Sequence, residues 1–227
     1  MAYRLVRGAL RDALPIGKTR SVTNVSVDVP STQDLIRRAA MRLFASRGYE
    51  ATTLQAVAEV VGISKQAILH HFRSKEELHA AVLRELIEHW NRTLPRLLET
   101  ASATRNRFDA VFSETVAFFE KDPDRARLVL RELLDRPDAT RQLLSEAILP
   151  WFQAIAGYMR IGQERGVHRA DVDPEAYLLQ VLQLAMIGIA TQDVMTAILG
   201  DGPQGQGRFS KELARIANAA LFTPRPV

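Results

Sequence analysis

An all-α fold in two parts is predicted by three features of the 227-residue sequence. Apolar residues recur at helical spacing along almost the whole chain after residue 30, with no sustained strand alternation there. Glycine, serine and proline divide this pattern into short segments at first and longer segments later. Hydrophobic content of 47% and charged content of 25% are ordinary for a globular protein. We predict a three-helix domain over 31–77, a larger helical domain over 78–227, and a basic arm over 1–30.

Residues 53–72, TLQAVAEVVGISKQAILHHF, are predicted to form two short helices joined by a tight turn. Thr52 is the expected cap of the first helix, with Gln55 completing a capping box. Gly62 can adopt the left-handed backbone that ends a helix, and Ser64 is a favourable N-cap for the next one. Such a pair is the outline of a helix-turn-helix, whose second helix enters the major groove of DNA. A helical hairpin without DNA binding is the alternative.

The second of these helices has one apolar side. Ile68 and Phe72 lie four residues apart and are predicted to face inward together. The side chains left facing solvent, or DNA, are Lys65, Gln66, Leu69 and His70.

The sequence around these helices carries a recognisable order of short motifs. An alanine-rich helix is followed by Leu43-Phe44, Gly48-Tyr49, Thr52-Thr53, Val57-Ala58, Gly62-Ile63-Ser64, and His71-Phe72 before Ser74-Lys75. Along about sixty residues this order resembles the DNA-binding domain of the tetracycline-repressor (TetR) family. The family usually has glycine where Gln66 stands and tyrosine where Leu69 stands.

The resemblance implies roles for individual residues. Thr53 and Lys75 match positions that contact phosphates, and a hydroxyl or a cation at a helix N-terminus suits that role. Lys65 and Gln66 lie in the first helical turn, where they can reach guanine and adenine edges. The tyrosine that the family usually has at the position of Leu69 would contact phosphate through its hydroxyl. Leu69 offers only an apolar contact, and His70 can replace part of the phosphate contact that is lost. The predicted DNA-binding residues are Thr53, Ser64, Lys65, Gln66, Leu69, His70 and Lys75.

The segments on either side extend this domain. The arm over 1–30 is basic and either touches DNA or is a disordered leader. A helix is predicted from near Ser31, with a buried stripe of Leu35, Ile36, Ala39, Ala40, Leu43 and Phe44. Ser74 to Glu77 form a capping box for a further helix, which is expected to break near Pro95.

Further helices follow in the second domain. One helix is expected over 104–120, and the next begins at Pro123 with Leu128, Leu130, Leu133 and Leu134 inside. A long helix is expected over 138–165, with a bend at Pro150. Another begins at Pro174 and contains the apolar stretch 177–199, and the last covers 209–221. The apolar runs in 177–199 are too short to span a bilayer. We expect one side of this helix to face a partner subunit, with Gly188 permitting close approach. The apolar surfaces of 177–199 and 209–221 together predict a homodimer. The resemblance implies that its interface is made of four helices, two from each subunit.

Aromatic residues between the long helices suggest a pocket for a small apolar or aromatic effector, although each is also explained as ordinary core. The predicted lining residues are Phe112, Phe119, Trp151, Phe152, Tyr158 and Met186, with Gln183 as a polar contact.

Catalytic and metal functions are not favoured. The chain has no cysteine, no nucleophile elbow and no dinucleotide signature, and the segment 200–207 lacks the lysine of a phosphate loop. His70 and His71 are adjacent and cannot share a metal from one helix face, and His79 and His89 have no partner at ligand spacing. We predict no catalytic residue, no metal and no cofactor.

These features together predict a cytoplasmic, ligand-responsive transcriptional regulator. In the family that the chain resembles, such proteins are usually repressors. The expected partners are double-stranded DNA with an inverted-repeat operator, a small apolar effector and a second copy of the chain. A formal net charge of +4 is compatible with a nucleic-acid partner. The alternative is a helical scaffold protein with a degenerate helix-turn-helix.

Overall fold

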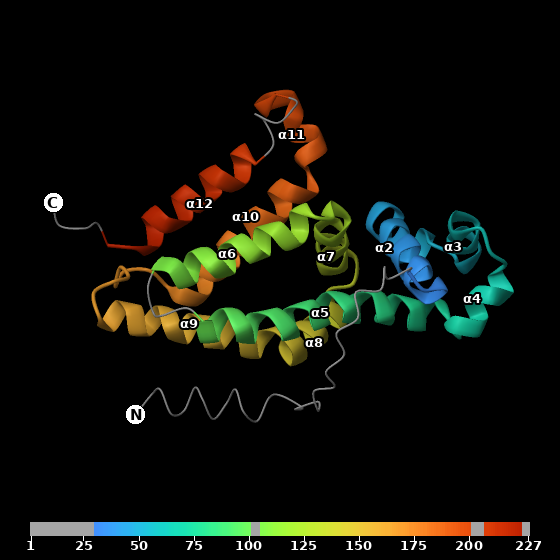
Figure 1. Cartoon of the computed structure of the whole chain (residues 1–227), viewed down its shortest axis with the longest axis horizontal. Coiled ribbons are helices and arrows are strands. Elements are labelled where there is room, and N and C mark those ends of the chain that lie inside the picture. The colour runs from blue at the N-terminus through green and yellow to red at the C-terminus, as the bar shows by residue number, and fades with distance from the viewer. Residues whose placement is uncertain (1–29, 101–104, 201–206, 224–227) are drawn as a thin grey trace, which may run out of the picture. The chain divides into compact units, whose positions relative to one another are not determined.

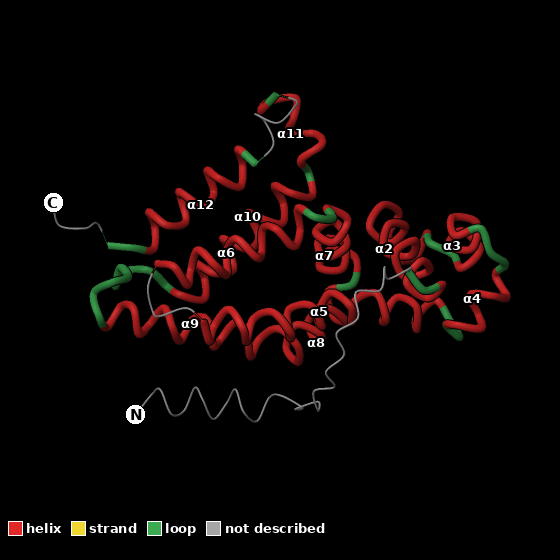
Figure 2. Tube along the Cα trace, viewed as in Figure 1, coloured by secondary structure: helices red, strands yellow, loops and turns green. Residues whose placement is uncertain are grey.

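The computed structural model describes residues 30–100, 105–200 and 207–223, and every regular element in these ranges is a helix (Figures 1 and 2). The predicted all-α fold is therefore confirmed. The elements are α2 (Thr32–Ala51), α3 (Leu54–Val61), α4 (Lys65–His71), α5 (Lys75–Thr100), α6 (Arg105–Glu120), α7 (Pro123–Asp135), α8 (Pro137–Leu143), the π-helix η1 (Leu144–Ile148), α9 (Leu149–Glu164), α10 (Pro174–Ala190), α11 (Gln192–Leu199) and α12 (Arg208–Leu221). The predicted basic arm, apart from Pro30, and residues 201–206 lie outside the described residues. None of the helices described is long and apolar enough to cross a membrane.

The helix-turn-helix follows from local capping. Gly62 ends α3 at a φ of 77°, and its N–H donates to Ala58 O over 2.9 Å. Ser64 caps α4, because its Oγ accepts a hydrogen bond from Ala67 N at 3.1 Å. Both predicted caps are confirmed. Ile68 of α4 is fully buried against the core of α2 and α3.

The cap of α3 is one residue later than predicted. Thr53 Oγ1 accepts from Ala56 N at 3.1 Å, whereas Thr52 is fully buried and its hydroxyl donates to Gly48 O at 2.8 Å. Gly48 has a φ of 82° and interrupts α2, so Thr52 closes the end of that helix instead. Gln55 donates to Glu59 and forms no capping box.

The start of α5 was predicted more accurately than its course. Ser74 Oγ accepts from Glu77 N at 3.2 Å, as expected, but the Glu77 carboxylate accepts from Arg73 N at 2.7 Å rather than completing the box. The predicted break near Pro95 is wrong, because α5 continues to Thr100. A proline inside a helix costs about 3 kcal/mol. Burial of the neighbouring Leu94 shows that tertiary packing holds this turn.

Helix α7 packs against α2 and joins the first three helices to the rest of the chain. Arg131 of α7 donates to two carbonyl oxygens near the end of α2, Ala45 O at 2.8 Å and Ser46 O at 2.9 Å. Asp122 caps α7 and Pro123 is its first residue, as predicted. Leu134 was predicted to lie inside, but 80% of its surface is exposed.

The inward position on α7 belongs instead to Glu132, which is buried and contacts a buried histidine of α5. Its Oε1 lies 2.8 Å from Nε2 of His79 on α5, and both side chains are almost completely buried. Arg136 Nη1 lies 3.1 Å from Nδ1 of the same histidine, and Thr140 donates to Glu132 O at 2.8 Å. This His79–Glu132 pair joins α5 to α7.

The helix predicted over 138–165 is present as a run of α8, η1 and α9. The π-helix lies immediately before Pro150, the second residue of α9. Because proline has no N–H and its ring clashes with the carbonyl four residues earlier, the helix widens there.

The apolar stretch 177–199 is divided between two helices, α10 and α11. The division is at Thr191, whose hydroxyl donates to Ile187 O at 2.7 Å. The predicted role of Gly188 at a subunit interface is wrong. A Cβ there would lie 2.0 Å from Cε1 of Phe209, so this glycine admits α12 of the same chain. Tyr177 also joins these helices by donating to Ala217 O at 2.7 Å.

Candidate nucleic-acid interface and internal cavity

The outer face of α4 is polar and accessible. Lys65, Gln66 and His70 are exposed and Leu69 is half-buried, while Ile68 fixes the opposite face in the core. Among the described residues, the side chains of Lys65 and Gln66 form no hydrogen bond or ion pair. His70 contacts the His71 ring, with 5.6 Å between centroids. The first turn of α4 therefore presents a cation and an amide to an external partner.

The two predicted phosphate-contacting residues lie at the starts of other helices. Thr53 uses a hydroxyl lone pair to cap α3, which leaves its O–H free to donate. Lys75 Nζ donates to Tyr49 O at 3.0 Å and lies 4.2 Å from the centre of the Tyr49 ring. The same ammonium donates a longer bond to Glu50 O at 3.4 Å. Because an ammonium group has three donors, this lysine retains one for a phosphate oxygen.

A tyrosine–glutamate hydrogen bond lies beside Lys75 and was not predicted from the sequence. Tyr49 donates to Glu76 Oε1 at 2.8 Å, across 27 positions of sequence. The pKa of Glu76 falls to about 2, first because its own backbone N–H binds its carboxylate and then because the Tyr49 hydroxyl does. Burial and the nearby glutamate raise the pKa of Tyr49 to about 12. Glu76 is therefore fully ionised at neutral pH.

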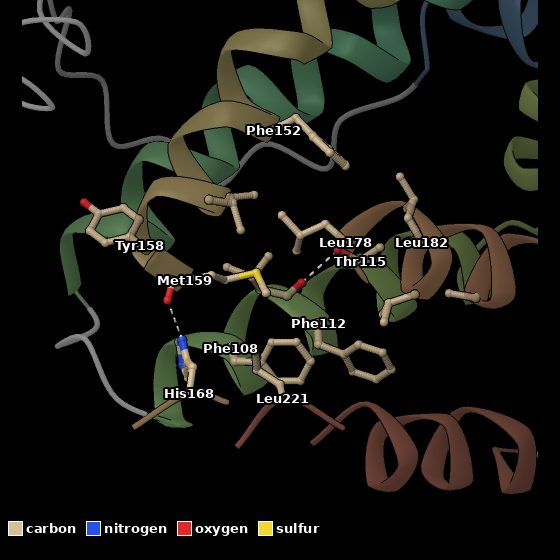
Figure 3. Close-up of a pocket in the computed structure, with 14 residues that line it drawn as sticks. Phe108, Phe112, Thr115, Phe152, Tyr158, Met159, His168, Leu178, Leu182 and Leu221 are labelled. Carbon is tan, nitrogen blue, oxygen red and sulfur yellow. Dashed lines mark hydrogen bonds between the residues drawn. The ribbon is translucent and has the colours of Figure 1, made fainter. Parts of the chain in front are cut away.

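A cavity of about 140 Å³ lies between α6, α9 and α10. Side chains from these helices point toward one another across it (Figure 3), and Phe108 packs against the cluster that contains Met159. Its lining is mostly apolar and consists of Phe108, Val111, Phe112, Thr115, Phe152, Ile155, Tyr158, Met159, His168, Leu178, Val181, Leu182, Ala185 and Leu221.

Three of the seven residues predicted to bind an effector line this cavity: Phe112, Phe152 and Tyr158. The structure places the other four elsewhere. Phe119 and Met186 belong to the buried core, Gln183 is exposed, and Trp151 donates to Asn91 Oδ1 at 2.8 Å. Helical spacing could not separate cavity from core, because both positions need apolar residues.

The polar groups among the described lining residues are few and partly satisfied. Thr115 donates to Val111 O at 2.8 Å, and Nδ1 of His168 lies 3.0 Å from Met159 O. Tyr158 lies at the edge, with its hydroxyl pointing outward (Figure 3). Such a cavity suits an apolar molecule with few polar groups. Within the described ranges, no group of three or more acidic or histidine side chains is arranged to hold a metal ion.

Two helices also carry apolar side chains on the surface. Leu179, Leu184 and Ile187 of α10 are each 48–49% exposed, and so is Ile216 of α12 at 49%. The two helices contact each other, and exposed apolar side chains on contacting helices are compatible with an interface with another protein.

Known proteins match both parts of the chain. The family model "Bacterial regulatory proteins, tetR family" matches residues 36–82, and "Tetracyclin repressor-like, C-terminal domain" matches residues 105–214. The transcriptional activator FasR of Mycolicibacterium smegmatis is 30% identical over 130 residues, which are 57% of this chain and 58% of FasR. The transcriptional repressor KstR2 of the same organism is 32% identical over 82 residues, which are 36% of this chain and 40% of KstR2. The matches thus span less than two thirds of either relative.

Solved structures match over a greater length. The ketosteroid transcriptional regulator KstR2 of Mycobacterium tuberculosis superposes with a TM-score of 0.70 at 18% identity, covering 88% of this chain and all of that one. FadR of Bacillus subtilis, solved in complex with stearoyl-CoA, gives a TM-score of 0.62 at 16% identity and covers 82% and 97% of the two chains. At these identities the likeness concerns the fold.

The fold and the site define a helix-turn-helix protein with a cavity in its second helical part. The two family models match these two parts in the same order along the sequence. The chain belongs to the tetR family of bacterial regulatory proteins.

Proposed function

We propose that this protein is a ligand-responsive transcriptional regulator, and specifically a repressor that leaves an inverted-repeat operator when a small apolar effector occupies the cavity. The observation that carries the proposal is the outer face of α4, where Lys65 and Gln66 are exposed while Ile68 anchors the helix. The relatives support the class, because FasR and KstR2 are both named as transcriptional regulators. Residues 31–77 form the DNA-binding part and 78–227 the effector and dimer part, in the cytoplasm.

In this proposal the DNA contacts divide into two kinds. Gln66 reads an adenine and Lys65 a guanine, because each can form hydrogen bonds to the major-groove edge of that base. Thr53, Ser64, His70 and Lys75 contact phosphates, which position the protein without reading sequence. Leu69 packs against a thymine methyl group.

The effector proposal depends on the chemistry of the cavity. FadR was solved with stearoyl-CoA, and KstR2 is described as a ketosteroid regulator, so two similar folds are connected with molecules that contain an apolar chain or ring system. The mostly apolar lining between α6, α9 and α10 supports an effector of the same general character. In this proposal, effector binding rearranges the second part of the chain. Because α5 joins that part to the helix-turn-helix, the rearrangement changes the separation of the two recognition helices in a dimer.

The first prediction tests DNA binding and release together. The full chain is mixed with duplex DNA from upstream of its own gene, and binding is followed by fluorescence anisotropy as salt is raised. We expect specific binding that weakens steeply with salt, because phosphate contacts release counterions. Stearoyl-CoA and a steroid then serve as effector probes, and one of them is expected to release the DNA.

The matched variant for this test is Ala185→Leu, which adds volume to the cavity wall without a charge. It should bind the DNA as the original chain does and no longer respond to the probe. Equal affinity for the upstream DNA and for unrelated DNA would contradict a regulator and favour a scaffold protein. Release from DNA that persists in Ala185→Leu would place the effector outside this cavity.

The second prediction concerns the dimer. We expect light scattering to give a dimer at micromolar concentration, formed by α10 and α12 of each chain. Replacing Ile187 and Ile216 by aspartate should give a monomer. A dimer would have to bury the new carboxylates in its interface, and burying an unpaired charge is costly. Leu134→Asp is the control, since Leu134 is exposed on α7. A monomer in the unmodified chain, or a dimer that survives both aspartates, contradicts this interface.

A further inference from the structure

A second hollow, of about 410 Å³, lies where α2, α5, α6 and α7 meet, and its walls are strongly basic. We call it the basic groove. Its residues are Arg37, Arg38, Met41, Arg42, Val82, Glu85, Leu86, His89, Arg92, Phe118, Lys121, Asp122 and Arg125. They come from positions 37 to 125 of the sequence, so no local motif could have indicated the groove.

The charges of the groove are not balanced from within. Six basic side chains face two carboxylates, and both carboxylates are already engaged. Glu85 accepts from Arg37 Nε at 3.0 Å, and the Asp122 carboxylate caps α7 by accepting from Asp124 N at 3.2 Å. Among the described residues, no ion pair is recorded for Arg38, Arg42, Arg92 or Lys121. An anionic ligand would therefore lower the electrostatic repulsion among these side chains.

The floor of the groove is apolar and fixed. Met41, Val82, Leu86 and Phe118 are all buried. The Arg125 guanidinium lies 4.4 Å from the centre of the Phe118 ring, and its Nη1 donates to Phe118 O at 2.8 Å. A cation held by an aromatic face and a carbonyl is positioned before any ligand arrives.

His89 forms part of the wall without adding charge. Its ring stacks on Phe118, with 4.2 Å between centroids and 24° between planes. Burial is the main cause that lowers the pKa of His89, and Glu114, whose Oε1 lies 3.3 Å from Nε2, opposes it. The positive field at neutral pH thus comes from the arginines and Lys121.

We propose that the basic groove binds a small molecule bearing two or more phosphate groups. Arginine side chains form paired hydrogen bonds to phosphate oxygens, and several arginines around one hollow suit a compact polyanion. The concave shape and the apolar floor favour a small molecule over a duplex, whose backbone needs a surface that follows the helix. This site is separate from the effector cavity and independent of the proposed DNA binding.

The position of the groove gives such a ligand a structural consequence. Three of its arginines, Arg37, Arg38 and Arg42, belong to α2. Lys121 lies between α6 and α7, and Arg125 lies in the first turn of α7. A polyanion bridging both sides would hold the first helix of the DNA-binding part against the second part.

The test is calorimetric titration of the full chain with inorganic pyrophosphate at constant ionic strength, with sulfate in a parallel titration. We expect saturable pyrophosphate binding that is tighter than sulfate binding by at least tenfold. The double variant Arg42→Gln/Arg92→Gln should bind pyrophosphate at least tenfold more weakly. Thermal unfolding of the variant in buffer alone verifies that the fold is retained.

Arg84→Gln is the matched control, because Arg84 is an exposed arginine of α5 that lines a different hollow, beside Glu77, Glu85 and Glu88. It should leave pyrophosphate binding unchanged. No saturable binding, no preference over sulfate, or equal binding by the double variant would overturn the proposal. If the double variant loses DNA affinity and salt dependence while pyrophosphate fails to bind, the groove is a DNA-backbone surface instead. Because pyrophosphate binding is measured without DNA, it can fail while the proposed regulator function stands.

Discussion

Replacing Glu132 by alanine is expected to lower the free energy of unfolding by about 1–3 kcal/mol, because it leaves a buried ring N–H of His79 without its acceptor. The Glu132 carboxylate lies 2.8 Å from the His79 ring, and the exposed fractions of the two side chains are 8% and 4%. Without the carboxylate, the ring nitrogen of His79 loses its partner in a site that water scarcely reaches. Arg136, 3.9 Å from the other carboxylate oxygen, also loses a neighbouring negative charge. Denaturant unfolding followed by circular dichroism measures the change.

The control for this prediction is a double-mutant cycle. His79→Leu/Glu132→Leu removes both polar groups together and should cost much less than Glu132→Ala, since an apolar pair in a buried site is often neutral. The coupling free energy between the two positions should reach at least about 1 kcal/mol, because contacting residues are not additive. If Glu132→Ala costs no more than an exposed substitution such as Glu59→Ala, the pair does not stabilise the junction of α5 and α7.

The second large effect is expected at the recognition helix. Gln66→Ala should relax base preference at one operator position by about 1–3 kcal/mol of discrimination, because the amide can pair with both groups on an adenine edge. The side chain is exposed in the first turn of α4, so its removal should leave the fold intact. Binding is measured on a set of operators that differ at single positions. An unchanged base preference would show that Gln66 is not a reader.

Lys75→Ala is the matched comparison, because Lys75 is proposed to contact phosphate. It should weaken binding to all sequences alike and lower the slope of log K against log salt by about one. The Lys75 ammonium is also bonded to Tyr49 O, so thermal unfolding is followed in parallel. A change in base preference without a change in salt slope would contradict the assignment of this lysine.

The parts of the fold that could be predicted are those coded locally. Gly62 and Ser64 act through their own backbone and nearest neighbours, so the turn between α3 and α4 could be derived from a few residues. Asp122-Pro123 and Asp173-Pro174 begin helices for the same reason. Two local predictions were wrong. Thr52 bonds back to Gly48 O instead of capping α3, and α5 continues through Pro95, where the neighbouring Leu94 is buried.

The parts that could not be predicted depend on contacts between distant positions. His79 and Glu132 are 53 residues apart, and each alone resembles an ordinary surface residue. Leu134 was assigned to the core from helical spacing, yet a buried glutamate holds the inward position. The cavity could be predicted as apolar from its aromatic residues, but Trp151 and Gln183 do not line it, because the rotation of each helix about its axis decides which residues do.

The two hydrogen bonds from Arg131 to carbonyl groups near the end of α2 also limit how domains can be exchanged between regulators of this family. The carbonyl groups of Ala45 and Ser46 near the end of α2 are satisfied by a side chain 85 or more positions downstream. A chimaera that joins residues 31–77 to the second part of a relative would lack this donor unless the new α7 carries an arginine at the same place. Carbonyl groups left without it must be solvated at the new junction. A graft between relatives therefore needs either this α7 or an α7 that carries an arginine at the position of Arg131.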